Sequence, residues 1–144
     1  GKGPELEKLV ELVDDLNIID SVKFINWIDK GLLSNYYKQA NIFFFPSHEG
    51  AGMVIPEALS YAIPALCFDN FGPGELTDDS CATRIKYSNY NQSVLDFGEA
   101  LNTLYLNNEL LTQKSENAFK LFQKKYTWNS KGDFLKDLYT KIEI

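Results

Sequence analysis

The sequence predicts an α/β protein in which helices cover both faces of a parallel sheet. Residues 42–45 and 65–68 are apolar at every position, which is typical of strands that are buried on both faces. Amphipathic helical segments alternate with these strands, and the connections are short. Elements that alternate in this way form parallel βαβ units with right-handed crossovers. We therefore expect a Rossmann-like, doubly wound sheet in a single domain, residues 1–144.

The first forty residues predict two helices and one strand. Gly1–Pro4 is a turn signal, and it leads into a helix over Glu5–Leu16 whose leucines and valines recur at helical spacing. Val22–Ile28 is rich in β-branched and aromatic residues and predicts a strand, and Leu32–Ala40 predicts a helix. A loop followed by a helix ordinarily comes after a strand. We therefore expect that βα units precede this piece of chain.

The remaining elements follow from apolar runs and their boundaries. Ile42–Phe45 and Ala65–Phe68 are the two continuous apolar strands, and Thr83–Tyr87 is a weaker third. Pro46 ends the first strand, and Pro56 fits a helix over Val54–Tyr61 because it falls within the first turn. The rest of the chain predicts three helices, at Val94–Leu106, Glu109–Tyr126 and Lys131–Ile142.

Composition narrows the function classes. The chain of 144 residues has a net charge of −6, which opposes binding to nucleic acid, since phosphate neutralisation needs clustered Lys and Arg. No apolar run is long enough to span a bilayer. Cys67 and Cys81 show no metal-ligand spacing, so we expect no metal site and no cofactor. The sequence leaves a disulfide open, and composition favours two reduced thiols in a cytoplasmic protein.

Ligands of open parallel sheets bind beyond the carboxyl ends of the strands. Two segments follow the buried strands, Pro46–Met53 and Asp69–Glu75. In the first, Gly50 and Gly52 let the backbone approach a ligand, and the next helix begins immediately afterwards. Helix starts attract anions such as phosphate. The sequence therefore predicts an anion-binding loop after the first buried strand.

Two carboxylates flank these glycines. Glu49 precedes them, and Glu57 falls about one turn into the following helix. A carboxylate accepts two hydrogen bonds at once and so suits the vicinal hydroxyls of a ribose or hexose. The glycines and Glu57, each taken alone, also have a purely structural interpretation. The glycines would form a tight turn, and Glu57 would complement the helix dipole. The combination favours a nucleotide-sugar site.

Residues 46–64, PSHEGAGMVIPEALSYAIP, resemble the signature of retaining GT-B glycosyltransferases of the family 4 type, also called glycosyl transferases group 1. That signature runs P-S-x-x-E-G-F-G, then E-A, then G-x-P-V, and its two acids have the spacing of Glu49 and Glu57. The flanking segments also resemble the family. Residues 1–4, GKGP, resemble its G-x-G-P motif, and residues 22–27 resemble its V-x-F-x-G strand. Residues 70–75 resemble its G-G-x-x-E loop, and Trp128 to Tyr139 resembles its closing helices.

The sequence departs from the signature at several positions. One residue instead of two separates Pro-Ser from Glu49, and Ala51 stands where Phe is usual. Ala62 replaces a glycine, and Pro73 splits the later double glycine. These changes bear on the shape of the sugar pocket and remove neither acid.

The resemblance implies that the chain is the C-terminal, donor-binding half of a GT-B enzyme. It implies that Glu57 holds the ribose hydroxyls and that Glu49 faces the transferred sugar. Substrate-binding residues are expected in both loops: His48, Gly50, Ala51, Gly52 and Met53 in the first, and Gly72, Gly74 and Glu75 in the second. His48, the only histidine, is a polar contact in this interpretation, although a histidine is also a residue type that serves as a base. Phe71 is a candidate for stacking on a base or sugar.

The expected function is transfer of a sugar, with retention, from a UDP- or GDP-sugar to a saccharide or lipid-linked acceptor. The Arg and Lys that neutralise the diphosphate in the family lie before its G-x-G-P, and the acceptor domain also precedes it. We expect both in a missing N-terminal domain, which would also provide peripheral contact with the cytoplasmic face of a membrane in polysaccharide biosynthesis. The piece alone would be inactive. The alternatives are a non-catalytic sugar-nucleotide-binding or partner module, and an epimerase of GT-B shape.

Overall fold

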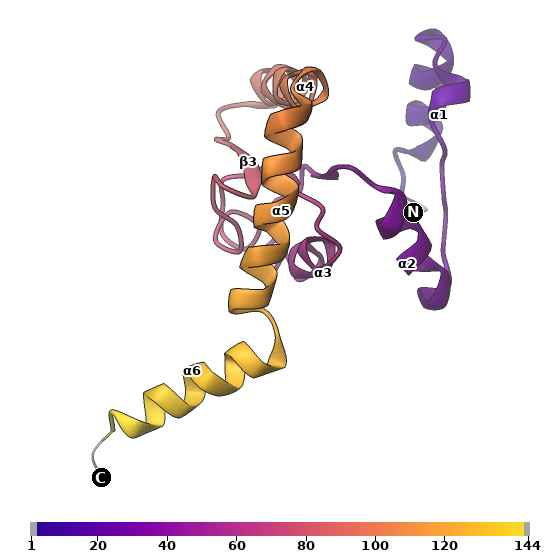
Figure 1. Ribbon diagram of the computed structural model, residues 1–144. Coiled ribbons are helices and arrows are strands. Elements are labelled where there is room, and N and C mark those ends of the chain that lie inside the picture. Colours follow the sequence, from indigo (N-terminus) through magenta and orange to yellow (C-terminus); the bar gives the residue numbers. More distant parts are fainter. Residues whose placement is uncertain (1–2, 143–144) are drawn as a thin grey trace. The chain divides into compact units, whose positions relative to one another are not determined.

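The computed structural model describes residues 3–142 and contains helices and a parallel sheet (Figure 1). The chain divides into two compact units, Gly1–Tyr36 and Tyr37–Ile144, which are described separately. The elements, in chain order, are α1 (Leu6–Asp15), a 3-10 turn (Ile19–Ser21), α2 (Lys30–Gln39), β1 (Phe43–Phe45), α3 (Val54–Ser60), β2 (Ala65–Phe68), β3 (Ala82–Ile85), α4 (Tyr90–Leu106), α5 (Asn108–Lys125) and α6 (Trp128–Thr140).

The first unit contains α1, the 3-10 turn and the first turns of α2. Val13 is the buried residue of α1, and the other apolar residues of its stripe are exposed or half-buried. Glu5 precedes the helix and pairs with Lys8 at 3.0 Å on its surface. The predicted helix Glu5–Leu16 is confirmed within one residue at each end. The predicted turn Gly1–Pro4 lies partly outside the described residues.

The second unit is built on a parallel sheet of three strands in the order β1-β2-β3. Phe43 pairs with Ala65 in the register of β1 and β2, and Ala65 pairs with Ala82 in that of β2 and β3. The predicted α/β class with a parallel sheet is therefore confirmed. β1 begins one residue later than predicted, and β3 covers 82–85 where the prediction was 83–87.

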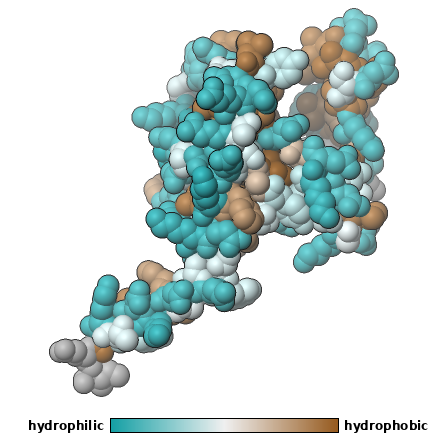
Figure 2. Space-filling model, in the orientation of Figure 1, coloured by the Kyte–Doolittle hydropathy of each residue, from teal (hydrophilic) through white to brown (hydrophobic). Residues whose placement is uncertain are grey.

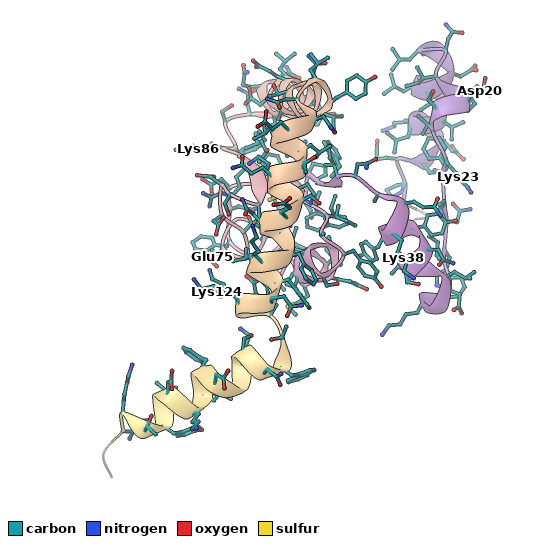
Figure 3. All side chains as sticks on the ribbon, in the orientation of Figure 1. Asp20, Lys23, Lys38, Glu75, Lys86 and Lys124 are labelled. Carbon is teal, nitrogen blue, oxygen red and sulfur yellow. The ribbon has the colours of Figure 1, made fainter. Side chains whose placement is uncertain are left out.

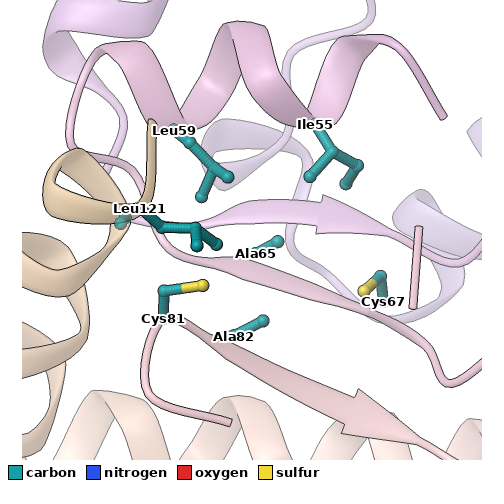
Figure 4. Close-up of a cluster of buried hydrophobic side chains, with 8 residues drawn as sticks. Ile55, Leu59, Ala65, Cys67, Cys81, Ala82 and Leu121 are labelled. Carbon is teal, nitrogen blue, oxygen red and sulfur yellow. The ribbon is translucent and has the colours of Figure 1, made fainter. Parts of the chain in front are cut away.

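The central strand β2 explains why its sequence is apolar at every position. Alternate side chains of a strand point to opposite faces of the sheet. Ala65 and Cys67 pack on one face with α3 and α5, whereas Leu66 and Phe68 pack with Phe97 of α4 on the other. Figure 4 shows the first of these clusters: Ile55, Leu59, Ala65, Cys67, Cys81, Ala82, Ala118 and Leu121. Helices thus cover both faces, as the doubly wound class requires.

The C-terminal helices begin earlier than the apolar pattern predicted. α4 begins at Tyr90 instead of Val94 because Asn89 caps it, accepting a hydrogen bond from Gln92 N at 3.0 Å. α6 begins at Trp128 instead of Lys131, and Thr127 accepts from Ser130 N at 3.1 Å. Apolar periodicity starts only where a helix meets the core, whereas a cap fixes the first turn itself.

The predicted strand Val22–Ile28 is wrong. Residues 22–25 form no regular element, and the side chain of Trp27 is 77% exposed. A β-strand is defined by hydrogen bonds to a neighbouring strand. Within residues 3–142 the sheet consists of β1, β2 and β3 alone, so this segment contributes no strand to it.

Helix α6 buries none of its residues. The apolar stripe predicted for this helix lies at the surface. Figure 2 shows that the visible surface of the protein includes both hydrophilic residues, in teal, and hydrophobic residues, in brown. The exposed apolar side chains of α6 are Trp128, Phe134, Leu135, Leu138 and Tyr139. Within the described chain, the core of the second unit is therefore completed by α3, α4 and α5.

Replacing Leu59 by alanine should strongly destabilise the second unit. Leu59 has no exposed surface and packs against the sheet from α3. Truncation of a fully buried leucine costs about 2–5 kcal/mol of unfolding free energy. Urea unfolding of Leu59→Ala measures this loss, and Leu106→Ala, whose side chain is 73% exposed, is the matched control. Equal losses in the two variants would contradict the packing described here.

The two thiols should be unreactive in the folded chain. Cys67 and Cys81 are both free and buried, and burial raises the pKa of Cys67 to about 11. At pH 8 about one Cys67 side chain in a thousand is then the reactive thiolate. A chromogenic thiol reagent should therefore label neither cysteine rapidly at pH 8 and both in urea. Rapid labelling of the native chain would place the thiols outside the core.

Candidate functional site

The two loops singled out in the sequence lie at one edge of the sheet. The first loop, residues 46–53, follows β1, and the second loop, residues 69–75, follows β2. Because β1 and β2 are parallel neighbours, their carboxyl ends meet at the same edge. The structure therefore brings the two candidate segments together, as the sequence predicted.

Glycines allow the two loops to pack backbone against backbone. Gly72 has φ +81°, and a Cβ atom there would lie 2.6 Å from the carbonyl oxygen of Glu49. Gly52 has φ +56°, and its Cβ would lie 3.0 Å from the backbone nitrogen of Pro73. Both conformations lie in the left-handed region, which favours glycine. Gly52 and Gly72 therefore have a structural role, and the structural alternative considered for the first loop holds at Gly52.

Gly50 differs from these two. A Cβ atom built at Gly50 would meet nothing within 4 Å, and the residue is exposed to solvent. No contact within the described chain explains the missing side chain. Gly50 therefore offers open backbone at the surface of the first loop.

Both candidate acids are exposed. Glu49 lies in the first loop, and Glu57 lies in the first turn of α3. The helix follows the loop without a break, since Ile55 N donates to the carbonyl oxygen of Gly52 at 2.8 Å. Met53 occupies the cap position and makes no side-chain cap hydrogen bond. The local chain order of acid, glycines, helix and acid is thus as predicted.

His48 belongs to an aromatic cluster. Its ring stacks on Phe68 with the centroids 4.2 Å apart and meets Tyr87 edge to face at 4.9 Å. The side-chain amide of Asn70 lies 3.4 Å from its Nδ1 atom. These contacts tie the first loop to the ends of β2 and β3, which is a positioning role that the sequence did not reveal.

Arg84 organises the second loop. Its guanidinium pairs with Asp69 at 3.3 Å and Asp79 at 2.8 Å, and it donates to the carbonyl oxygen of Gly74 at 3.3 Å. The hydrogen bond to Asp79 raises the pKa of Arg84, which is charged at all ordinary pH values. Sequence reasoning missed Arg84, although a charged residue within a predicted strand is itself a signal.

A cavity of about 490 Å³ adjoins the second loop. Glu75, labelled in Figure 3, is exposed at this loop, and Phe71 is 78% exposed. The lining residues are Asp69, Asn70, Phe71, Gly74, Glu75 and Arg84. In such a cavity the aromatic ring is able to pack against the face of a sugar ring, and the carboxylate and amide groups are able to hydrogen-bond to the sugar hydroxyls.

Neither a metal cluster nor a membrane-spanning helix occurs in the described part of the chain. Among residues 3–142, no three His, Cys, Asp or Glu side chains are grouped so that they could hold a metal ion. No helix over the same residues is long and apolar enough to cross a bilayer.

Residues 1–121 match the family model described as Glycosyl transferases group 1. The chain belongs to the glycosyl transferases group 1 family. Over 81 residues, or 55% of the chain, it is 33% identical to the amylovoran biosynthesis glycosyltransferase AmsD of Erwinia amylovora. The match covers 22% of AmsD, so the chain spans about a fifth of that curated relative.

Two solved structures of glycosyltransferases share the fold. The C-terminal domain of LpcC, a glycosyl transferase group 1 family protein of Francisella tularensis, matches 88% of the chain with a TM-score of 0.73 and 22% identity, over 66% of that structure. The pneumococcal O-GlcNAc transferase GtfA, solved with UDP and GlcNAc, matches 99% of the chain with a TM-score of 0.78 and 20% identity, over 28% of its own chain. The fold is therefore that of the C-terminal Rossmann-like domain of such glycosyltransferases.

Replacing Gly72 by alanine should separate the loops of this group 1 chain. The new Cβ would collide with the backbone of Glu49 and Gly50. Strain at a positive φ angle costs about 1–3 kcal/mol, and the collision adds to that cost. We expect a lower urea midpoint and large amide shifts at residues 46–53 in Gly72→Ala.

The control for this variant is Gly98→Ala in α4. A Cβ atom at Gly98 would meet nothing within 4 Å, and alanine is favoured in helices by about 1 kcal/mol. If Gly72→Ala is as stable as Gly98→Ala and leaves the first-loop amides unshifted, the two loops do not pack in solution as described.

Proposed function

We propose that this chain, residues 1–144, is the donor-binding domain of a retaining glycosyltransferase of the family 4 type. The complete protein would transfer a sugar from a UDP- or GDP-sugar to a saccharide or lipid-linked acceptor. The observation that carries the proposal is the position of two exposed acids in a group 1 family member: Glu49 lies in the glycine loop after β1, and Glu57 lies in the first turn of the helix that follows this loop.

The two carboxylates have different roles in this proposal. Glu57 would accept hydrogen bonds from the ribose hydroxyls of the nucleotide, and Glu49 would contact the transferred sugar. Gly50, Ala51 and Met53 would present backbone amides to the sugar and diphosphate. Support for backbone contact comes from the open space at Gly50.

The second loop would close the sugar side of the site. Glu75 is exposed there and is free to reach a sugar hydroxyl, and the cavity beside it has room for a ring. Gly72 and Gly74 are buried in loop packing, so any contact of theirs with a donor would use backbone atoms. Gly72 lets the two loops meet, whereas Gly74 lets the second loop pack on its own backbone at Asn70.

Retention requires the new bond to form on the face that the leaving group vacates. The bond between the anomeric carbon and the diphosphate oxygen breaks, and the acceptor oxygen bonds to the same carbon. The acceptor proton would pass to the leaving diphosphate oxygen. This route needs no nucleophile paired with a base, and neither acid is held by an ion pair within residues 3–142.

The cations that a diphosphate requires must come from other parts of the protein. No Lys or Arg occurs between Lys38 and Arg84, and Arg84 already pairs with Asp69 and Asp79. We therefore propose that an N-terminal domain supplies them together with the acceptor site, and that the chain alone binds donor weakly without turnover. A non-catalytic nucleotide-sugar-binding module is the second candidate, because the same lack of cations favours binding without transfer. The cytoplasmic location, with contact to the membrane face through the other domain, stays a prediction.

Donor binding is tested by titrating the isotopically labelled chain with UDP- and GDP-sugars. We expect amide shifts at residues 46–57 and 70–75. In Glu57→Gln, affinity for the shifting donor should fall about 10- to 100-fold, because hydrogen bonds to a charged group contribute about 1.5–3 kcal/mol. Glu116→Gln, on the exposed surface of α5, is the matched control.

Two outcomes would contradict the proposal. One is the absence of shifts around Glu49 and Glu57 with every donor at millimolar concentration. The other is an equal loss of affinity in Glu57→Gln and Glu116→Gln, which would show a general charge effect. Donor binding by a full-length protein that transfers no sugar would favour the non-catalytic module.

A further inference from the structure

Tyr37 is the only buried residue of α2 within the described chain, and its ring is held on two sides. The ring stacks on that of Tyr61, with centroids 5.1 Å apart and planes at 15°. It also lies 6.3 Å from the ring of Phe43 in β1. Because the ring is fixed by these neighbours, its hydroxyl group has a defined position.

That position is beside Glu57. Tyr61 caps α3 and follows Glu57 by four residues, which places the two on the same side of the helix. Burial raises the pKa of Tyr37, and the negative charge of Glu57 and a side-chain hydrogen bond to its carboxylate raise it further. Near neutral pH the hydroxyl is therefore protonated and available as a donor to that carboxylate.

The carboxylate retains acceptor capacity after this hydrogen bond. An ionised carboxylate has about four lone-pair sites, and the Tyr37 hydroxyl uses one of them. The nearby hydroxyl of Ser60 leaves the carboxylate untouched, since it donates to the backbone oxygen of Glu57 at 2.6 Å. Glu57 is exposed, so its remaining lone pairs face solvent and any ligand.

We propose that Tyr37 is a positioning residue for Glu57, holding the carboxylate in the orientation that receives the two ribose hydroxyls of a nucleoside diphosphate. The inference rests on the proposed function, because it concerns the same acid. Core packing does not require the hydroxyl of Tyr37, because phenylalanine would fill the same space. The inference gives this hydroxyl a role.

The neighbouring Tyr36 provides a matched comparison. It is 42% exposed, and the ammonium group of Lys23 lies 5.9 Å from its ring centroid. Tyr36→Phe therefore removes a tyrosine hydroxyl one residue away from Tyr37 without touching the proposed contact. Both substitutions keep the ring and its packing.

The test measures the affinity of the 144-residue chain for UDP and GDP and for their 2′,3′-dideoxy analogues. Tyr37→Phe should weaken binding of the ribose forms about 3- to 10-fold and leave the dideoxy forms unchanged. Tyr36→Phe should change neither. Adding Tyr37→Phe to Glu57→Gln should cause no further loss, because the two residues act through one carboxylate.

Failure of this inference and failure of the proposed function give different results. If Glu57→Gln binds the ribose forms as well as the unaltered chain, the proposed function fails and the inference with it. If Glu57→Gln weakens binding and Tyr37→Phe does not, only the inference is overturned. An equal loss of ribose and dideoxy forms in Tyr37→Phe also overturns it, because that pattern indicates a merely structural role.

A measurement without ligand tests the contact itself. The ring-carbon chemical shift of Tyr37, followed as pH rises, reports its ionisation. Glu57→Gln should lower the pKa of Tyr37 and leave the titration of Tyr36 in place, because it removes the nearby charge. An unchanged Tyr37 titration would overturn the inference even if the chain bound no nucleotide.

Discussion

The contact between two loop backbones is the constraint on which the candidate site depends. A side chain at Gly72 would lie 2.6 Å from the carbonyl oxygen of Glu49, so the loops after β1 and β2 meet only because that side chain is absent. Three side-chain groups reinforce the contact from outside. His48 stacks on Phe68 at the end of β2, and Arg84 ties Asp69 to the carbonyl oxygen of Gly74. Tyr126 of α5 donates to the carbonyl oxygen of Leu76, directly after the second loop, at 2.7 Å.

The sheet makes this constraint effective because it is rigid at the strand that carries the second loop. β2 is buried along its whole length, with α3 and α5 on one face and α4 on the other. Strand pairing fixes the register of β1 and β3 to it. Loops that begin at the ends of packed parallel strands keep a defined geometry, whereas their exposed residues remain available to a ligand. The acids and Gly50 belong to this exposed set.

The parts of the fold that sequence could predict are those governed by local pattern. Continuous apolar runs located β1 and β2, and helical spacing located six helices, with the starts of α4 and α6 missed because Asn89 and Thr127 act through capping. The strand expected at 22–28 was predicted from composition, which favours extended backbone but does not decide which segments enter the sheet. The same distinction applies to the candidate site. A local sequence motif identified Glu49 and Glu57. Tyr37 and Arg84 lie 20 and 27 residues away from Glu57 in the sequence, and their contacts arise only in the folded chain.

The electrostatics of the site favour a division of labour in the proposed enzyme. Both loops offer carboxylates and backbone amides, and the stretch from Lys38 to Arg84 contains no further cation. Carboxylates repel a diphosphate, yet they are strong acceptors for hydroxyl groups. A site of this composition gains little affinity from the phosphates and much discrimination from the hydroxyls of ribose and sugar. In the proposed enzyme the charge of the diphosphate would be balanced by groups outside this stretch, and the donor would be held firmly only when both parts of the site come together. Such an arrangement would link donor binding to the approach of the proposed acceptor domain and would limit hydrolysis of the donor when no acceptor is present.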